Sequence, residues 1–263
     1  MVKRVFFAIA VVVSINAAAQ TMTEMSLTRS EAAAGNPDAE YNMGWCYHNG
    51  LGVERNYDEA LKWYKKAAAH GVASAMYNIG TCYDNGEGVM KDMKEAVKWY
   101  RQAADKGLPE AQFNLGLCYE EGDGVEQNTA EAMKWYSKAA EKGFAMAQYN
   151  LGVCYYSQKN FAEAVKWYRK AASQGNAEAE TNLGVCYEQG EGVAKDMKEA
   201  VKWYTQAANR GIPEAQAYLA ECYYNGEGVA KDEAKAIELY KKSAAKGCTD
   251  AKEALHQLGI KGY

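Results

Sequence analysis

The sequence of 263 residues contains only three histidines and three prolines, and it has no excess of positive charge. With so few histidines, a histidine-rich metal site is not expected. Thirty lysines and arginines stand against 34 aspartates and glutamates, a formal net charge of −4. Nucleic-acid binding without sequence preference needs clustered positive charge, so this balance argues against it. The 48% hydrophobic and 24% charged residues are an ordinary globular composition, which excludes a disordered or fibrous chain.

The N-terminus has the pattern of a secretory signal peptide. Lys3 and Arg4 precede an apolar run over residues 5–13, and small residues follow as far as Ala19. The run is too short for an ordinary membrane span. We therefore predict a signal peptide over residues 1–19, cleavage after Ala19, no stable membrane span elsewhere, and a periplasmic or secreted protein. An uncleaved anchor is the alternative. Removing the signal peptide takes the formal net charge from −4 to −6.

The rest of the chain repeats one motif. The pattern G-x-[PAT]-x-A recurs from Gly35 at a spacing of 36 residues, with one spacing of 32. Self-similarity at such a period predicts a repeat architecture. We predict an N-terminal capping segment over 20–35, six repeats, and a C-terminal capping helix and tail over 248–263. The repeats span residues 36–71, 72–107, 108–143, 144–175, 176–211 and 212–247.

Each repeat is predicted to form two helices. In the second repeat, apolar residues over 73–83 recur at helical spacing and fall on one face, which gives helix A. The glycines of residues 85–89 break this pattern. Helix B follows Asp92, an N-cap residue, with Glu95 completing a capping box, and ends at Gly107. The equivalent helix B caps are Asn56, Asp92, Asn128, Asn160, Asp196 and Asp232.

The recurring pattern A-x-x-x-[LIM]-G-x-x-Y-x-x-G-x-G-V, followed by W-Y-x-x-A-A-x-x-G, resembles the Sel-one-like repeat family, relatives of the tetratricopeptide repeats. The match covers about residues 36–258. The resemblance implies an all-α, right-handed superhelical solenoid of antiparallel helix pairs. It also implies a scaffold role, with a concave groove lined by the A helices. The repeat at 144–175 departs from the pattern, because residues 156–160 replace the glycine loop and are four residues short. We predict a tight turn and a local change of curvature there.

Six of the seven cysteines occupy one position on the apolar face of helix A: Cys46, Cys82, Cys118, Cys154, Cys186 and Cys222. Equivalent positions in adjacent repeats should lie about 8–10 Å apart, whereas a disulfide needs Cα atoms within about 7 Å. We interpret these cysteines as small buried apolar residues that are neither disulfide-bonded nor metal ligands. We expect Cys248 to be the most reactive thiol.

The polar face of helix A carries an asparagine ladder beside an aromatic row. The candidate partner-binding residues are Tyr41, Asn42, Trp45, Tyr77, Asn78, Phe113, Asn114, Tyr149, Asn150, Asn182 and Tyr218. Asparagine can both donate to and accept from a peptide backbone, and aromatic rings give contact area at low entropic cost. The alternative is that asparagine and tyrosine brace neighbouring repeats. Acidic residues on this face favour a neutral or basic polypeptide partner.

The sequence offers little catalytic machinery. The three histidines are far apart along a solenoid, the common nucleophile motifs are absent, and the glycine loops lack the lysine of a P-loop. We predict no catalytic, cofactor or metal site, and an exported scaffold or adaptor that binds a protein or an extended peptide. Two alternatives stay open. One is a cell-envelope hydrolase, because some relatives have been labelled penicillin hydrolases, and the other is a purely structural spacer.

Overall fold

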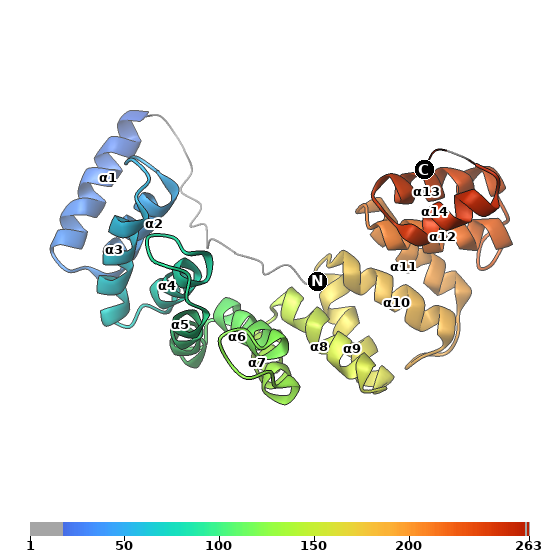
Figure 1. Ribbon diagram of the computed structural model, residues 1–263, viewed down its shortest axis with the longest axis horizontal. Coiled ribbons are helices and arrows are strands. Elements are labelled where there is room, and N and C mark those ends of the chain that lie inside the picture. Colours follow the sequence, from blue (N-terminus) through green and yellow to red (C-terminus); the bar gives the residue numbers. More distant parts are fainter. Residues whose placement is uncertain (1–17, 261, 263) are drawn as a thin grey trace. The chain divides into compact units, whose positions relative to one another are not determined.

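The computed structural model describes residues 18–260 and residue 262. Within these residues the chain is all-α, with 14 helices and no strand (Figure 1). The helices are α1 (Ala18–Ala33), α2 (Pro37–Asn49), α3 (Tyr57–Ala69), α4 (Ala73–Asn85), α5 (Met93–Asp105), α6 (Pro109–Glu121), α7 (Thr129–Glu141), α8 (Ala145–Ser157), α9 (Phe161–Ser173), α10 (Ala177–Gln189), α11 (Met197–Asn209), α12 (Pro213–Asn225), α13 (Glu233–Ala245) and α14 (Thr249–Gln257).

The helices pair in chain order, and each pair is one repeat. The A helix of a repeat packs against its B helix, as α2 packs against α3 and α12 against α13. The predicted class, an all-α solenoid of helix pairs, is therefore confirmed. The chain forms two compact units, residues 1–142 with α1–α7 and residues 143–263 with α8–α14. The predicted signal peptide lies outside the described residues except for Ala18 and Ala19, which begin α1.

The turn from helix A to helix B is closed by the N-cap residue. The Asp92 side chain accepts hydrogen bonds from the backbone N–H groups of Lys94 and Glu95, at 2.9 and 3.2 Å. Its own N–H donates to the Tyr83 carbonyl at 2.9 Å, and the Glu95 side chain pairs with Lys98. The expected capping box is thus replaced by a backbone bond to helix A. The same two features recur in the other five repeats, at Asn56, Asn128, Asn160, Asp196 and Asp232.

The short repeat makes its turn without glycine. Helix α8 ends at Ser157 and α9 begins at Phe161, so three residues connect them. Lys159 takes the left-handed conformation, with φ of +60°, which the loop glycines take in the other repeats. The Asn160 N–H donates to the Tyr155 carbonyl at 2.9 Å, as at every other helix A to helix B turn. This is the tight turn that the missing residues predict.

A glycine of helix A and a tyrosine of helix B set the distance between the two helices. A β-carbon on Gly80 would lie 2.6 Å from Cδ1 of Tyr100, which is closer than real β-carbon contacts. The same contact occurs at four other pairs: Gly44 with Tyr64, Gly116 with Tyr136, Gly152 with Tyr168, and Gly184 with Tyr204. The sixth repeat has Ala220 instead, and its Tyr240 is 8% exposed where the other five tyrosines are 0 or 1% exposed. The glycine therefore lets the ring sink fully into the core.

A second glycine brings each loop onto the preceding repeat. A β-carbon on Gly124 would lie 2.3 Å from the carbonyl oxygen of Met93, the first residue of α5. Gly88 meets the backbone of Tyr57 in the same way, and Gly192 and Gly228 meet Phe161 and Met197. Each of these glycines also has φ near +70°. Both the close approach and the backbone conformation require a residue without a β-carbon.

The repeat cysteines belong to the core. All seven cysteines are free thiols, and five of the six repeat cysteines are buried, with Cys46 half-buried. Burial raises the pKa of Cys82, Cys186 and Cys222 to about 12. In the absence of a metal ion these thiols stay protonated at neutral pH, and their burial is what the sequence predicts.

Candidate partner-binding surface

The aromatic row of the predicted groove packs onto the tyrosines of helix B. The ring centroids lie 5.9 Å apart for Tyr41 and Tyr64, 5.8 Å for Tyr77 and Tyr100, 5.7 Å for Phe113 and Tyr136, and 6.1 Å for Tyr149 and Tyr168. All four pairs are tilted by similar angles, which is a favourable arrangement for aromatic rings. The row therefore has a structural role in every repeat that carries it.

In the unit of α1–α7, the middle of the predicted groove is interior. Tyr77, Phe113 and Asn114 are each 1% exposed, and Asn78 is 7% exposed. The Asn114 side chain donates to the hydroxyl of Tyr77 in the preceding repeat at 3.4 Å. This contact is the brace that was the alternative for the asparagine ladder.

The first repeat leaves more of its predicted residues accessible. Asn42 is exposed and Trp45 is half-buried, while Tyr41 beside them is 8% exposed. The Trp45 indole N–H is itself buried and has no hydrogen-bond partner among the described residues, so it is the rest of the ring that is accessible. Asn42 and Trp45 are thus the residues of this unit that could meet a partner.

In the unit of α8–α14, three of the four predicted residues are accessible. Tyr149, Asn182 and Tyr218 are half-buried, whereas Asn150 is 4% exposed. They come from the A helices of three successive repeats, α8, α10 and α12. We call Tyr149, Asn182 and Tyr218 the tyrosine face, together with the nearby acids Glu178, Glu188, Glu214, Glu221 and Asp250.

Acidic side chains surround the tyrosine face. Burial raises the pKa of Tyr149, and the nearby Glu178 carboxylate raises it further, while the Asn182 amide lowers it. Burial also raises the pKa of Tyr218, with added effects from Asp250, Glu188 and Glu214. Both tyrosines therefore lie in a negative field.

The Glu221 carboxyl on this face is repelled by neighbouring carboxylates. Burial raises the pKa of Glu221, and the charges of Glu188, Glu227 and Asp250 raise it further. Within the described part of α8–α14, neither Glu221 nor Asp250 forms an ion pair with a lysine or arginine. The repulsion among these carboxylates would be relieved by a cation from outside the chain.

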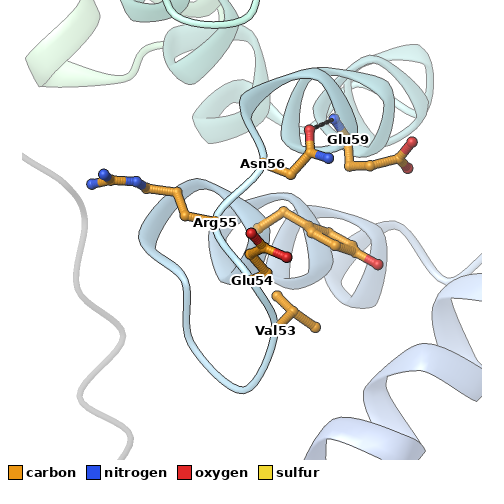
Figure 2. Close-up of a pocket in the computed structure, with 6 residues that line it drawn as sticks. Val53, Glu54, Arg55, Asn56 and Glu59 are labelled. Atoms are coloured by element: carbon orange, nitrogen blue, oxygen red, sulfur yellow. Dashed lines mark hydrogen bonds between the residues drawn. The ribbon is translucent and has the colours of Figure 1, made fainter.

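A separate surface pocket of about 520 Å³ lies at the turn between α2 and α3 (Figure 2). Its lining residues are Tyr47, Val53, Glu54, Arg55, Asn56 and Glu59. The Asn56 side chain accepts from the Glu59 backbone N–H at 3.1 Å, so it is already engaged as a helix cap. None of the predicted groove residues lines this pocket, and we assign it to the turn.

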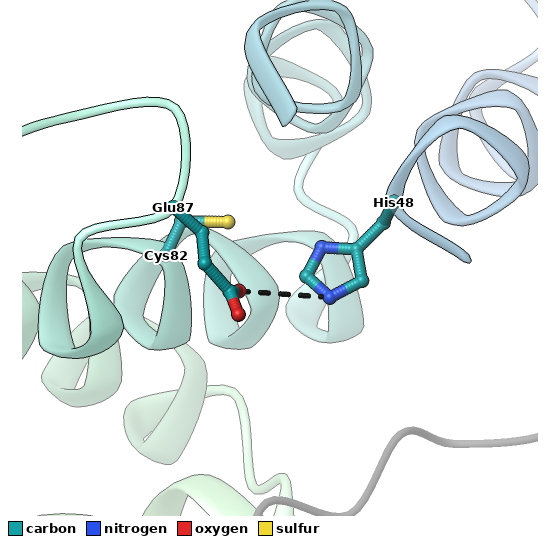
Figure 3. A group of neighbouring side chains, drawn as sticks. All are labelled: His48, Cys82 and Glu87. Carbon is teal, nitrogen blue, oxygen red and sulfur yellow. Dashed lines mark ion pairs between the residues drawn. The ribbon is translucent and has the colours of Figure 1, made fainter. Parts of the chain in front are cut away.

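Sequence reasoning missed one cluster of side chains. His48 on α2 faces Cys82 on α4 and Glu87 in the loop after α4 (Figure 3). One ligand atom of each residue lies within 4.8 Å of the other two. Burial lowers the pKa of His48, partly offset by the Glu87 charge. The signal available in the sequence was that His48 stands where later repeats carry Asp84, Glu120 and Glu188.

Stacked helix hairpins with this repeated glycine and tyrosine chemistry define a helical-repeat solenoid. The chain belongs to the Sel1 repeat family, whose model matches residues 37–72, 73–108, 109–144, 177–212 and 213–248. The short repeat matches a tetratricopeptide repeat model instead, over residues 145–174. Members of the family typically act as scaffolds for protein–protein interaction.

Two solved structures resemble the chain over most of its length. A protective antigen of uropathogenic Escherichia coli strains, displaying an SLR fold, is 39% identical with a TM-score of 0.85. The match covers 91% of this chain but 52% of that protein, so this chain spans about half of its length. A Sel1 repeat protein from Oxalobacter formigenes is 40% identical with a TM-score of 0.71, covering 78% of this chain and 86% of that protein. The comparison with curated proteins gave no match.

Proposed function

We propose that this protein is an exported, non-enzymatic scaffold that binds another polypeptide on the polar face of its A helices. The tyrosine face carries the proposal. It combines two half-buried aromatic rings, the Asn182 amide and several carboxylates over three successive repeats. Large rings beside a hydrogen-bonding amide suit an extended peptide, because they give contact area and backbone recognition together.

The charge of the face defines the partner. Glu178, Glu214 and Glu221 are exposed, and the pKa of Glu221 is raised by burial and by neighbouring carboxylates. A lysine or arginine placed there would lower that pKa and remove the repulsion. We therefore expect a partner that is basic, or at least neutral, where it meets this face. Asn42 and Trp45 would form a smaller contact of the same kind in the other unit.

Export is supported by the basic start and apolar run of residues 1–19. The similarity to a protective antigen adds to this support. No helix in the described part of the chain is long and apolar enough to cross a membrane. Intact-mass measurement of the protein recovered from outside the cytoplasm should give a chain that begins at Gln20. A mass that retains residues 1–19 would favour the uncleaved anchor.

The binding face is tested with a double variant. The chain from Gln20, immobilised, is used to capture proteins from envelope extracts, and the captured partner is then titrated against variants. Tyr218→Ala with Glu221→Gln should weaken binding at least about tenfold, because a half-buried aromatic anchor and a charge contact are lost together. Helicity should be unchanged. Equal affinity of the double variant and the unaltered chain would place the contact elsewhere.

Glu238→Gln is the matched control. It removes one carboxylate from the same unit, but from helix α13, where Glu238 pairs with Lys242 at 2.6 Å on the exposed side. Affinity should not change in this variant. If no polypeptide is captured at all, the structural-spacer alternative is favoured over the scaffold.

A further inference from the structure

We propose that His48, Cys82 and Glu87 form a binding site for a zinc ion between the first and second repeats. His48 lies near the end of α2, Cys82 lies on α4, and Glu87 lies in the glycine loop that follows α4 (Figure 3). Nε2 of His48 and Oε2 of Glu87 are 3.6 Å apart. The site goes beyond the proposed scaffold function and does not depend on it.

Comparison of equivalent positions in the repeats shows that His48 is unusual. In the second, third and fifth repeats an acid occupies the position of His48 and accepts a hydrogen bond from the helix B tyrosine. Tyr100 donates to Asp84 at 3.2 Å, and Tyr136 donates to Glu120 at 2.6 Å. In the first repeat the corresponding tyrosine is Tyr64. Its hydroxyl has no hydrogen-bond partner within the described residues.

Two of the three side chains in this cluster also have buried polar atoms without a hydrogen bond. Nδ1 of His48 and Oε2 of Glu87 are buried and accept or donate no hydrogen bond within residues 18–260. Oε2 of Glu87 lies 3.6 Å from Nε2 of His48, an ion-pair distance that is too long for a hydrogen bond. A buried polar atom without a partner costs about 1–3 kcal/mol. Oε2 of Glu87 is therefore a buried acceptor that an ion bound beside Nε2 of His48 would satisfy.

The donor set selects the ion. One imidazole nitrogen, one thiol sulfur and one carboxylate oxygen are the ligand types of zinc, whereas magnesium and calcium prefer oxygen alone. Tetrahedral zinc with bonds of about 2.0–2.3 Å places its ligand atoms roughly 3.3–3.8 Å apart. The 3.6 Å between Nε2 of His48 and Oε2 of Glu87 is already within this range. The ligand atoms of the cluster lie up to 4.8 Å apart, so the widest pair would have to approach by about 1 Å to bind one ion.

The surroundings allow an ion to enter. Cys82 is fully buried, but the side chains of His48 and Glu87 are 23% and 26% exposed. Three protein ligands and an open edge leave the fourth position to water, as in open zinc sites. When zinc binds, the Cys82 sulfur exchanges its proton for the metal, and the proton goes to solvent.

The junction of the fourth and fifth repeats provides a matched control within the same chain. Tyr156 stands in the register of His48, and its hydroxyl donates a hydrogen bond to Glu191, the counterpart of Glu87. Cys186 lies beside them, and its pKa is raised by burial and further by the charge of Glu191. This second cluster has equivalent positions without a nitrogen ligand, and its tyrosine and carboxylate are hydrogen-bonded to each other.

The test uses the chain from Gln20, stripped with a chelator and titrated with zinc chloride by calorimetry. Cobalt(II) chloride serves as a spectroscopic probe, because a thiolate ligand gives an intense near-ultraviolet charge-transfer band and a tetrahedral site gives visible bands. One ion per chain, with both bands, is expected. Cys82→Ala should lose the charge-transfer band and at least about 100-fold in affinity, since even outer contacts of metal sites contribute 10–100-fold.

His48→Tyr keeps the test falsifiable if a cavity at position 82 disturbs folding. It reproduces the residue that the fourth repeat carries at this position, Tyr156, whose hydroxyl donates to Glu191, so it should fold and lose zinc binding. Cys186→Ala should bind zinc like the unaltered chain. The proposal is overturned if the unaltered chain shows no binding at millimolar zinc. It is also overturned if Cys82→Ala retains the charge-transfer band, because the sulfur ligand would then be another cysteine.

Discussion

Tyr100 of α5 lies against Gly80 of α4 so closely that a β-carbon on the glycine would come within 2.6 Å of ring carbon Cδ1. The ring is completely buried and cannot move aside without disturbing the core. Gly80→Ala should therefore lower the free energy of unfolding by up to about 2 kcal/mol. Overpacking costs about 1–3 kcal/mol and the gain in helix propensity returns about 1. Urea denaturation followed by circular dichroism measures this difference.

Ala220 provides the comparison for that variant. Because position 220 already carries a β-carbon beside Tyr240, Ala220→Gly should lose only the helix propensity of alanine, about 1 kcal/mol or less. A Gly80→Ala protein as stable as the unaltered chain would show that the ring can shift freely.

Two glycines allow the cost of a left-handed backbone to be measured separately from the cost of a steric clash. Gly124 and Gly35 both have positive φ, at +73° and +85°, but only Gly124 approaches another backbone, with Met93 oxygen 2.3 Å from a β-carbon. Gly35→Ala should cost about 1–2 kcal/mol for the left-handed conformation alone. Gly124→Ala should cost at least about 1 kcal/mol more, from the clash. Equal losses in thermal or urea unfolding would contradict the close contact between repeats.

The helix B cap offers a milder test. Asp92→Ala removes the acceptor for the Lys94 and Glu95 N–H groups and should destabilise the protein by about 1 kcal/mol. Asp92→Asn should be nearly neutral, because asparagine holds the same position at Asn56 and Asn128. If both variants lost stability equally, the charge of Asp92 rather than its hydrogen bonds would be the source of the effect.

The buried thiols predict a loss of stability at high pH. The pKa of Cys82 is raised from 9.0 to about 12 by burial, with a further contribution from the Glu87 charge. Between these values the unfolded thiol ionises while the folded thiol keeps its proton. The free energy of unfolding therefore falls as pH rises above about 9. Over pH 8 to 10.5 each such thiol should account for a loss of about 2 kcal/mol.

Comparison with Cys82→Ala isolates the contribution of this thiol from those of the buried tyrosines. Urea unfolding at pH 8 and at pH 10.5 should show a decline that is smaller in the variant by about 2 kcal/mol. A decline of the same size in both proteins would mean that Cys82 ionises in the folded state as easily as in the unfolded chain.

Most of the fold could be predicted because each repeat is specified by local signals. Glycines end the A helices, Asp92 and its counterparts begin the B helices, and the missing residues before Asn160 require a tight turn. The role of the asparagine ladder could not be predicted, because Asn78 and Asn182 are the same residue at the same position. The first is buried and the second is half-exposed, and only the packing of neighbouring repeats decides this.

The cluster of His48, Cys82 and Glu87 was missed for a related reason. The cysteines were compared only with one another, at equivalent positions that lie too far apart for a shared site, and the histidines only with one another, far apart along the solenoid. The cluster joins three different positions of two adjacent repeats. Its detection requires knowing which face of one repeat meets which loop of the next.

The contacts between repeats also bear on how such a chain changes length during evolution. Where the second glycine is present, each loop meets the first turn of the preceding B helix through the same backbone atoms, as Gly124 meets Met93 and Gly228 meets Met197. If recombination duplicates or deletes a hairpin, the hairpins that become adjacent can form the same loop-to-helix contact. The hairpin of α8 and α9 lacks that glycine and is four residues short. It is the copy whose place in the order is least exchangeable.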